Sequence, residues 1–348
     1  ETENTSFVVD VNISDPAKTC QDMNIAFSPS IHFSDGNVTN EYTLNNVGDF
    51  NITMQEILGS EYALVDEDDT SVDTRLITPY TTQITVLPHH FDIDGNLSNG
   101  SNGFTYLNNF EGNASLDQNI SALLSWDVIA KGETNVTTTN YTNTCYAKDG
   151  NLTLTLVLSQ TSPNLSKLLY YDNDTLVLGE NPIAGPYLLP DYTKDRFVTG
   201  DSNGTGTFTY RLNFDRNLTK VVNPFQMDIS NLRVDDNNSV TGNDIIDNNA
   251  TYVYGRTNAG RQRYLITNNG ELKNANLYHE IYCFGTTNVN NNCNTSLLPS
   301  LNRTSDIRWY QNTDHNSSRD GNISSVVHSR GTNDVNATTP DETSYPSK

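Results

Sequence analysis

Basic side chains are scarce in this chain, with 20 Lys and Arg against 42 Asp and Glu and a formal net charge of -22. Nucleic acids and anionic membrane surfaces are bound through basic faces, so neither is expected as a partner. Long apolar runs are absent from the sequence as well, since none approaches the roughly 18–20 residues that span a bilayer. Membrane insertion is therefore not expected.

The sequence also lacks the motifs of common catalytic classes. It has no Gly-x-Ser-x-Gly elbow, no Walker loop and no dinucleotide fingerprint. The four Cys form no Cys-x-x-Cys pair, so zinc, haem and thioredoxin-type sites have no support. The Gly-rich stretch 200–206 does not precede a helix and is better explained by a hairpin turn than by a phosphate cradle. We therefore predict no enzyme activity and no cofactor.

One short segment combines residue types that bind metals. His89 and His90 precede Asp92 and Asp94, but adjacent side chains of a strand point to opposite faces, which disfavours a shared ion. The run Asp92-Ile93-Asp94-Gly95-Asn96 resembles the start of a calcium loop. It has no closing Glu at the loop's end, so calcium at Asp92, Asp94 and Asn96 is only a weak alternative.

Asparagine, by contrast, is abundant, with 48 Asn among 348 residues. Asn and Asp favour turns and disfavour helix interiors. Thr, Tyr and Val recur and are typical of strands, while the apolar fraction of 35% allows only thin cores. This composition predicts short strands joined by many turns.

Many of these asparagines stand in Asn-x-Ser/Thr sequons. The chain has 22 sequons, against roughly ten expected by chance. An acidic residue lies two positions before the Asn in 15 of them, where about three would be expected. This extended motif resembles the acceptor of bacterial oligosaccharyltransferases and predicts N-linked glycans on exposed segments. The 15 predicted glycosylation sites are Asn12, Asn37, Asn51, Asn96, Asn113, Asn119, Asn135, Asn151, Asn203, Asn217, Asn237, Asn249, Asn316, Asn322 and Asn336.

Turn chemistry is the alternative explanation of the motif. Asp-Gly-Asn is a common turn sequence, and it occurs at 35–37, 94–96, 149–151 and 320–322. It does not explain Asp10-Val11-Asn12, Asp117-Gln118-Asn119 or Asp215-Arg216-Asn217, so we favour glycosylation.

The cysteines indicate the compartment. Four Cys allow three pairings, and Cys283 and Cys293 flank a Gly- and Asn-rich loop that favours a local bond. That choice leaves Cys20 with Cys145, which would tie the N-terminal segment to the next domain. Free buried thiols are the alternative. An even count in a glycosylated chain favours an oxidising, exported setting.

Hydrophobic alternation predicts an all-β protein with two to three β-sandwich (Ig-like) domains and extended terminal segments. Clear strands are expected at 6–13, 80–87, 152–158 and 206–214, whereas 121–130 fits either a helix or a buried strand. We expect an N-terminal β domain at 1–87, a central β-sandwich at 88–235, a C-terminal β domain at 236–310 and a polar extended tail at 311–348. A polar tail is ordered only when something holds it, which suggests a repeating assembly in which extended segments dock on neighbours as strands.

Three segments in the last third of the chain follow a pattern of Tyr-Gly-Arg, a strand with Glu and Tyr, and then a Trp. They are Ala250-Thr-Tyr-Val-Tyr-Gly-Arg256, Leu277-Tyr-His-Glu-Ile-Tyr-Cys283 and Ile307-Arg308-Trp309. The pattern resembles the C-terminal region of MshQ-like proteins, which are large exported proteins associated with mannose-sensitive haemagglutinin type IV pili. Segments 87–92 and 128–141 are similar to parts of the preceding domain of that family, so the resemblance covers roughly 87–325. It implies an exported, β-rich surface or pilus-associated protein without catalytic residues.

These features together predict a structural glycoprotein outside the cell or on a bacterial cell surface. The first hypothesis is a subunit of an extracellular filament or pilus-like appendage that self-associates into a polymer through strand contacts. The alternative is an adhesin whose Tyr- and Asn-rich loops bind a host or surface glycan. A secreted polysaccharide hydrolase is the least favoured class, because paired carboxylates are common in any chain this acidic.

Overall fold

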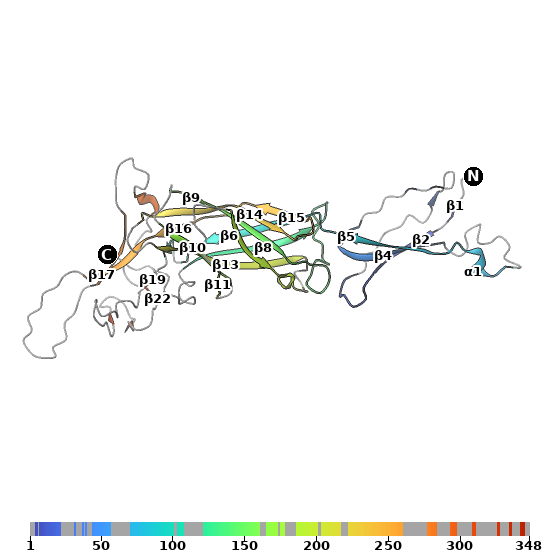
Figure 1. The fold of residues 1–348 in the computed structure, drawn as a ribbon, viewed down its shortest axis with the longest axis horizontal. Coiled ribbons are helices and arrows are strands. Elements are labelled where there is room, and N and C mark those ends of the chain that lie inside the picture. Colours follow the sequence, from blue (N-terminus) through green and yellow to red (C-terminus); the bar gives the residue numbers. More distant parts are fainter. Residues whose placement is uncertain are drawn as a thin grey trace, which may run out of the picture.

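The computed structural model describes residues 4–5, 7–21, 31–32, 37, 39, 44–56, 70–100, 103–107, 121–160, 165–172, 175–177, 186–200, 203–216, 222–259, 277–283, 293–297, 308–310, 326–327, 334–335 and 342–344. The described chain is all-β, as predicted, apart from one four-residue helix, α1 (Val72–Arg75), and the short 3-10 helices η2 (Lys194–Arg196) and η3 (Thr295–Leu297). In these residues, no helix is long and apolar enough to cross a membrane. Figure 1 shows a central stack of strands from which a small N-terminal sheet projects.

Two sheets form the central sandwich. The first has five antiparallel strands in the order β11 (Thr175–Val177), β10 (Leu165–Asp172), β13 (Thr205–Arg216), β8 (Ala122–Lys131) and β6 (His90–Ser98). The second has the order β12 (Tyr187–Tyr192), β9 (Gly150–Leu158), β14 (Phe225–Asp235), β16 (Ala250–Val253) and β7 (Thr105–Tyr106), with β15 (Thr241–Asp244) paired to β14. Its β16 and β7 run parallel, and its other pairs are antiparallel.

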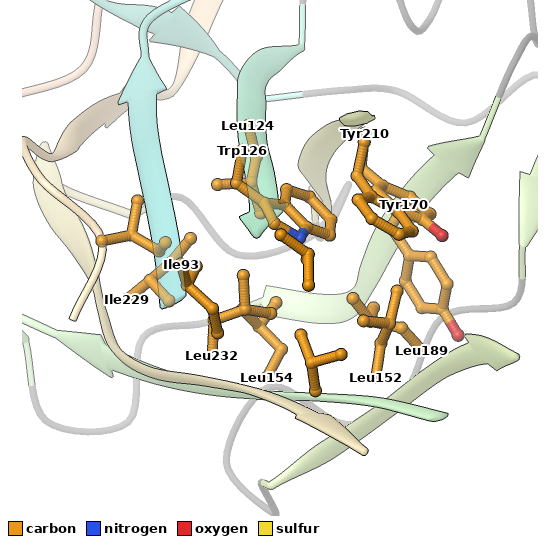
Figure 2. Packing of buried hydrophobic residues seen from close by; sticks show 14 of the residues in the cluster. Ile93, Leu124, Trp126, Leu152, Leu154, Tyr170, Leu189, Tyr210, Ile229 and Leu232 are labelled. Carbon is orange, nitrogen blue, oxygen red and sulfur yellow. The ribbon is translucent and has the colours of Figure 1, made fainter. Parts of the chain in front are cut away.

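The sandwich core fills the space between these sheets. Every second residue of β8 is buried, which settles the ambiguous segment 121–130 as a strand. Trp126 of β8 stacks on Phe208 and Tyr210 of the neighbouring β13, at ring-centroid distances of 5.3 and 5.1 Å. Figure 2 shows Trp126 and Tyr210 facing Leu154 and Leu232 of the other sheet. The alternation predicted at 152–158 and 206–214 is likewise confirmed in β9 and β13.

Residues 236–254 belong to the sandwich, although their sequence pattern predicts a separate C-terminal unit from residue 236 onward. The chain turns back after β14, so that β15 pairs with it over Leu232–Asp235, and β16 then pairs with its other end. Val240, Ile246 and Tyr252 lie in the sandwich core as a result. The chain beyond them forms a hairpin of β17 (Gly255–Ala259) with β18 (Leu277–Ile281).

Short strands make up the described residues from 308 to the end of the chain, which include the predicted polar tail at 311–348. β19 (Arg308–Tyr310) pairs with β22 (Glu342–Ser344), and β20 (Val326–Val327) pairs with β21 (Asp334–Val335). The rest of 311–348 lies outside the described residues.

The N-terminal sheet is a single layer of three antiparallel strands, β2 (Phe7–Ile13), β4 (Gly48–Glu56) and β5 (Tyr80–Val86). A separate two-residue pair joins β1 (Asn4–Thr5) to β3 (Ile31–His32). The sheet has its own small core of Val9, Val11 and Phe50, with five further apolar side chains packed against it. The apolar side chains alternate along all three strands, so they gather on one face.

A short joint connects the N-terminal sheet to the sandwich. The predicted disulfide Cys20–Cys145 is present and spans 125 residues of sequence, and the other predicted bond, Cys283–Cys293, is present as well. Val47, just before β4, is buried in the sandwich core. The N-terminal sheet is therefore anchored by a covalent bond and by an inserted apolar side chain.

Candidate functional site

The candidate site is the set of acid-preceded sequon asparagines, of which the structure describes nine. Six are exposed and three are half-buried, and none is buried. The exposed ones are Asn12, Asn37, Asn96, Asn135, Asn237 and Asn249, and the half-buried ones are Asn51, Asn151 and Asn203. The predicted sites Asn113, Asn119, Asn217, Asn316, Asn322 and Asn336 lie outside the described residues.

Four of the nine asparagines lie within strands rather than turns. Asn12 is in β2, Asn51 in β4, Asn96 in β6 and Asn151 in β9. Turn chemistry therefore does not explain these sequons, and its application to 94–96 and 149–151 is wrong.

The glycines of those two Asp-Gly-Asn runs are explained by packing instead. A Cβ on Gly95 would lie 2.6 Å from Cδ1 of Ile246 and 2.8 Å from Cβ of Trp126. A Cβ on Gly150 would lie 2.3 Å from the carbonyl oxygen of Asp235 and 2.5 Å from the hydroxyl of Tyr192. All four distances are far below van der Waals contact, so only glycine fits at these points of the strands.

Turn conformation does account for two other sequons. Asn135 and Asn237 have positive φ values of 61° and 57°, which Asn adopts more easily than most residues. The carboxylate of Asp235 also accepts the backbone N–H of Asn237 at 2.9 Å, as in an Asx-turn. Here the acidic residue two positions before the Asn has a local structural role beside any role in recognition.

Several sequon amides accept a hydrogen bond through their side-chain oxygen, whereas the amide nitrogen of Asn151 donates one to Oδ1 of Asn237 at 2.6 Å. Oδ1 accepts a hydrogen bond from Asn248 Nδ2 in Asn96 (2.6 Å), from the Gly200 N–H in Asn203 (2.7 Å) and from Gln226 Nε2 in Asn249 (3.1 Å). An N-linked glycan is attached to the amide nitrogen. The hydrogen bonds accepted by Asn96, Asn203 and Asn249 would therefore orient these side chains without blocking the atom that is modified.

Asn140 is a complete sequon with the opposite environment. It has Thr138, not an acidic residue, two positions before it and is 2% exposed. Its Nδ2 donates to the Gln21 carbonyl and its Oδ1 accepts the Gln21 N–H, each at 2.8 Å, while its own N–H donates to Oδ1 of Asn46 at 2.8 Å. A glycan on this nitrogen would break the joint between the N-terminal sheet and the sandwich.

Two predicted sites share the polar face of the N-terminal sheet. Asn12 and Asn51 are directly opposite each other across β2 and β4, and Gln83 of β5 follows in the same row. Asp49, which precedes Asn51 by two residues, accepts the hydroxyl of Thr85 at 2.7 Å, and this bond lowers the pKa of the carboxyl, opposed by burial and aided by Lys18. The sequon acid therefore stays ionised to a lower pH than an unperturbed Asp does.

The His–Asp cluster differs from its prediction in one respect. The rings of His89 and His90 do meet, with their Nδ1 atoms 3.0 Å apart, because His89 precedes β6 and is not held to the alternation of the strand. The other ring nitrogen of His90, Nε2, lies 3.2 Å from Asp92. The two contacts use opposite edges of one ring and do not converge on a common point.

The calcium candidate lies in a strand rather than in a loop. Asp92, Asp94 and Asn96 stand at alternate positions of β6, roughly 7 Å apart along one face. Asp92 already contacts His90 and Lys131. Among the described residues, no group of three or more His, Cys, Asp or Glu side chains could hold a metal ion.

A buried polar cluster at the joint end of the sandwich was not anticipated from the sequence. Asp236 is 2% exposed, and its Oδ1 accepts the N–H groups of Asn238 (2.8 Å) and Val240 (3.1 Å). Burial raises the pKa of Asp236, and burial followed by the nearby Asp236 charge raises the pKa of Tyr192. The bonds to Asn238 and Val240 are local, but Tyr192 lies 44 positions from Asp236, so no local pattern could have indicated that these two groups are close.

Comparisons with known proteins add little to this geometry. No protein-family model matches the chain, and no curated protein matches it. One solved structure, described as a β-glycosidase from Bacteroides vulgatus, aligns with 10% identity and a TM-score of 0.19 over 69% of this chain. The alignment covers only 21% of the glycosidase chain. A likeness at this TM-score carries no argument.

Proposed function

We propose that this chain is an extracellular structural glycoprotein and a subunit of a bacterial cell-surface filament or pilus-like appendage. The observation that carries the proposal is the placement of the acid-preceded sequons. Of the nine described ones, six are exposed, three are half-buried and none is buried, and four lie on strands where turn chemistry gives no reason for the motif. Glycans at such positions would cover the outer faces of the sheets and keep an assembly soluble.

The scaffold supports the same proposal. Two disulfides are typical of proteins that fold in oxidising, exported compartments. The chain presents sheet edges, which are suited to strand-to-strand contacts between subunits. The resemblance to MshQ-like pilus-associated proteins agrees with this setting and is part of the proposal.

The experiment is negative-stain electron microscopy of material from its natural source, with intact-mass analysis of the same sample. Uniform fibres and a mass well above the 38.6 kDa of the bare chain are expected. Single particles at the bare mass would contradict both the filament and the glycans. Single particles at the raised mass would contradict the filament alone and favour the adhesin alternative, to be tested next on a glycan array.

A further inference from the structure

The edge strand β5 lacks the features that usually protect a sheet edge. It reads Tyr80-Thr-Thr-Gln-Ile-Thr-Val86, with no charged residue and no proline. Its seven residues pair with β4 in unbroken register, without a bulge. In the described part of the chain, β4 is the sole strand that pairs with β5, so the other side of β5 presents free backbone donors and acceptors. Such an edge is a template for another strand.

The other described edge strands are each protected. In the sandwich, β12 contains Pro190 and a register shift, β11 and β7 have three residues or fewer, and β15 has four. The edge of β6 is covered by Asp247, whose backbone bonds Gly95 and Leu97. On the far side of the N-terminal sheet, β2 has Asp10 at its centre. The short pairs of the terminal regions contain charged residues or have two residues per strand.

The two faces beside this edge differ in character. The apolar face is open at its outer end, where Tyr80 is 62% exposed and its partner Met54 is 41% exposed. The opposite face is polar and has the predicted glycan sites Asn12 and Asn51. The edge and the apolar face are thus the parts of this sheet that glycans would leave uncovered.

We propose that β5 pairs with β5 of a second copy of this chain, antiparallel and centred on Gln83. This register places Gln83 opposite Gln83, Thr82 opposite Ile84, Thr81 opposite Thr85 and Tyr80 opposite Val86. Positions of equal parity then meet, so the two apolar faces join into one face of a six-stranded sheet. The exposed Tyr80 ring packs beside Val86 of the second copy, and such aromatic and β-branched cross-strand pairs stabilise sheets.

The absence of charge on β5 and the elongated arrangement of the chain favour a second copy as the occupant of this edge. Each chain has a net charge of -22, so two copies repel each other unless the contact is uncharged and the remaining charge is kept apart. β5 has no charge. Figure 1 shows the N-terminal sheet projecting from one end of the sandwich, so antiparallel pairing places the two sandwiches at opposite ends of the joined sheet. That separation exceeds the screening length of about 8 Å at physiological salt.

This inference rests on the proposed function, because it names one subunit contact of the assembly. It gives a two-fold dimer, which would need a second, different contact to grow into a filament.

The test uses a charge swap at the two-fold axis in the full chain. Gln83→Lys and Gln83→Glu are on an exposed position, so each should fold, and each would oppose its own charge across the axis. We expect each variant alone to lose at least tenfold in dimer affinity by analytical ultracentrifugation. An equimolar mixture of the two should recover dimers. Asp10→Asn, on the opposite edge of the same sheet, is the matched control and should leave the affinity unchanged.

Cysteine pairs test the register. Gln83→Cys alone should form a disulfide-linked dimer, whereas Thr81→Cys should do so only when mixed with Thr85→Cys. Dimers unaffected by the Gln83 charge variants, or a chain that is monomeric throughout, would overturn the β5 pairing. Fibres that persist in natural material while the β5 variants have no effect would overturn this contact alone and leave the proposed function standing.

Discussion

The central sandwich buries one face of each of its sheets against the other, whereas the N-terminal sheet is a single layer with three buried apolar residues. The edges of the sandwich are short, covered or interrupted by Pro190, while β5 of the N-terminal sheet is open and uncharged. Both regions use strands of similar composition. The comparison indicates that the sandwich contains most of the packed core and that the N-terminal sheet, with its small core, depends more on its joint.

The largest effect is expected from the sandwich core. Trp126→Ala would remove a side chain that is 2% exposed and stacks on two rings, and should lower the free energy of unfolding by about 3–5 kcal/mol. Phe50→Ala in the N-terminal sheet should instead unfold only that sheet and leave the sandwich folded. Calorimetry with hydrogen exchange would measure both. If Phe50→Ala unfolded the sandwich as well, the two regions would not be separate.

Removal of the joint disulfide comes next. Replacing Cys20 and Cys145 with Ser frees a loop of 125 residues and should destabilise the chain by about 2–5 kcal/mol. The Cys283 and Cys293 double Ser variant is the control, since its loop of 10 residues predicts a smaller loss. Equal losses in thermal denaturation would argue against a special role for the joint.

A smaller effect is expected at the buried sequon. Asn140→Ala removes both side-chain bonds to Gln21 and should weaken the joint by about 1–3 kcal/mol. Hydrogen exchange of β2 and β4 should accelerate while the sandwich strands stay protected. Asn12→Ala, at an exposed sequon, is the matched control and should leave exchange unchanged. Unaltered exchange in Asn140→Ala would show that the hydrogen bonds of Asn140 are not needed to hold the sheet.

The smallest effect concerns pH and Asp236. Because burial raises its pKa, the ionised carboxylate destabilises the fold, and stability relative to Asp236→Asn should rise as pH falls through that raised pKa. The gain should be complete once pH drops below the pKa of the unfolded chain. Asn can still accept the N–H groups of Asn238 and Val240. Denaturant titrations of both proteins at several pH values would test this, and a difference that stays constant with pH would contradict it.

The parts of the fold that sequence reasoning predicts are those with local signals. Alternation in β9 and β13 reports one buried face and so identified both strands. Turn chemistry is the wrong explanation for Gly95 and Gly150. These positions need glycine because Ile246, Trp126, Asp235 and Tyr192, which are distant in sequence, occupy the space that a Cβ would fill. Distant contacts also hide the role of Asn140, whose partners lie 94 and 119 residues away. The sequon pattern can be recognised in the sequence, but the sequence does not indicate which of these asparagines are buried.

Site-by-site glycopeptide mapping of material from the natural source tests the central claim most directly. The account predicts glycans on the exposed acid-preceded asparagines, including Asn12, Asn96 and Asn237, and an unmodified Asn140. Bare peptides at the exposed sites would contradict it. So would a glycan on Asn140, because the joint that it forms leaves no room for one.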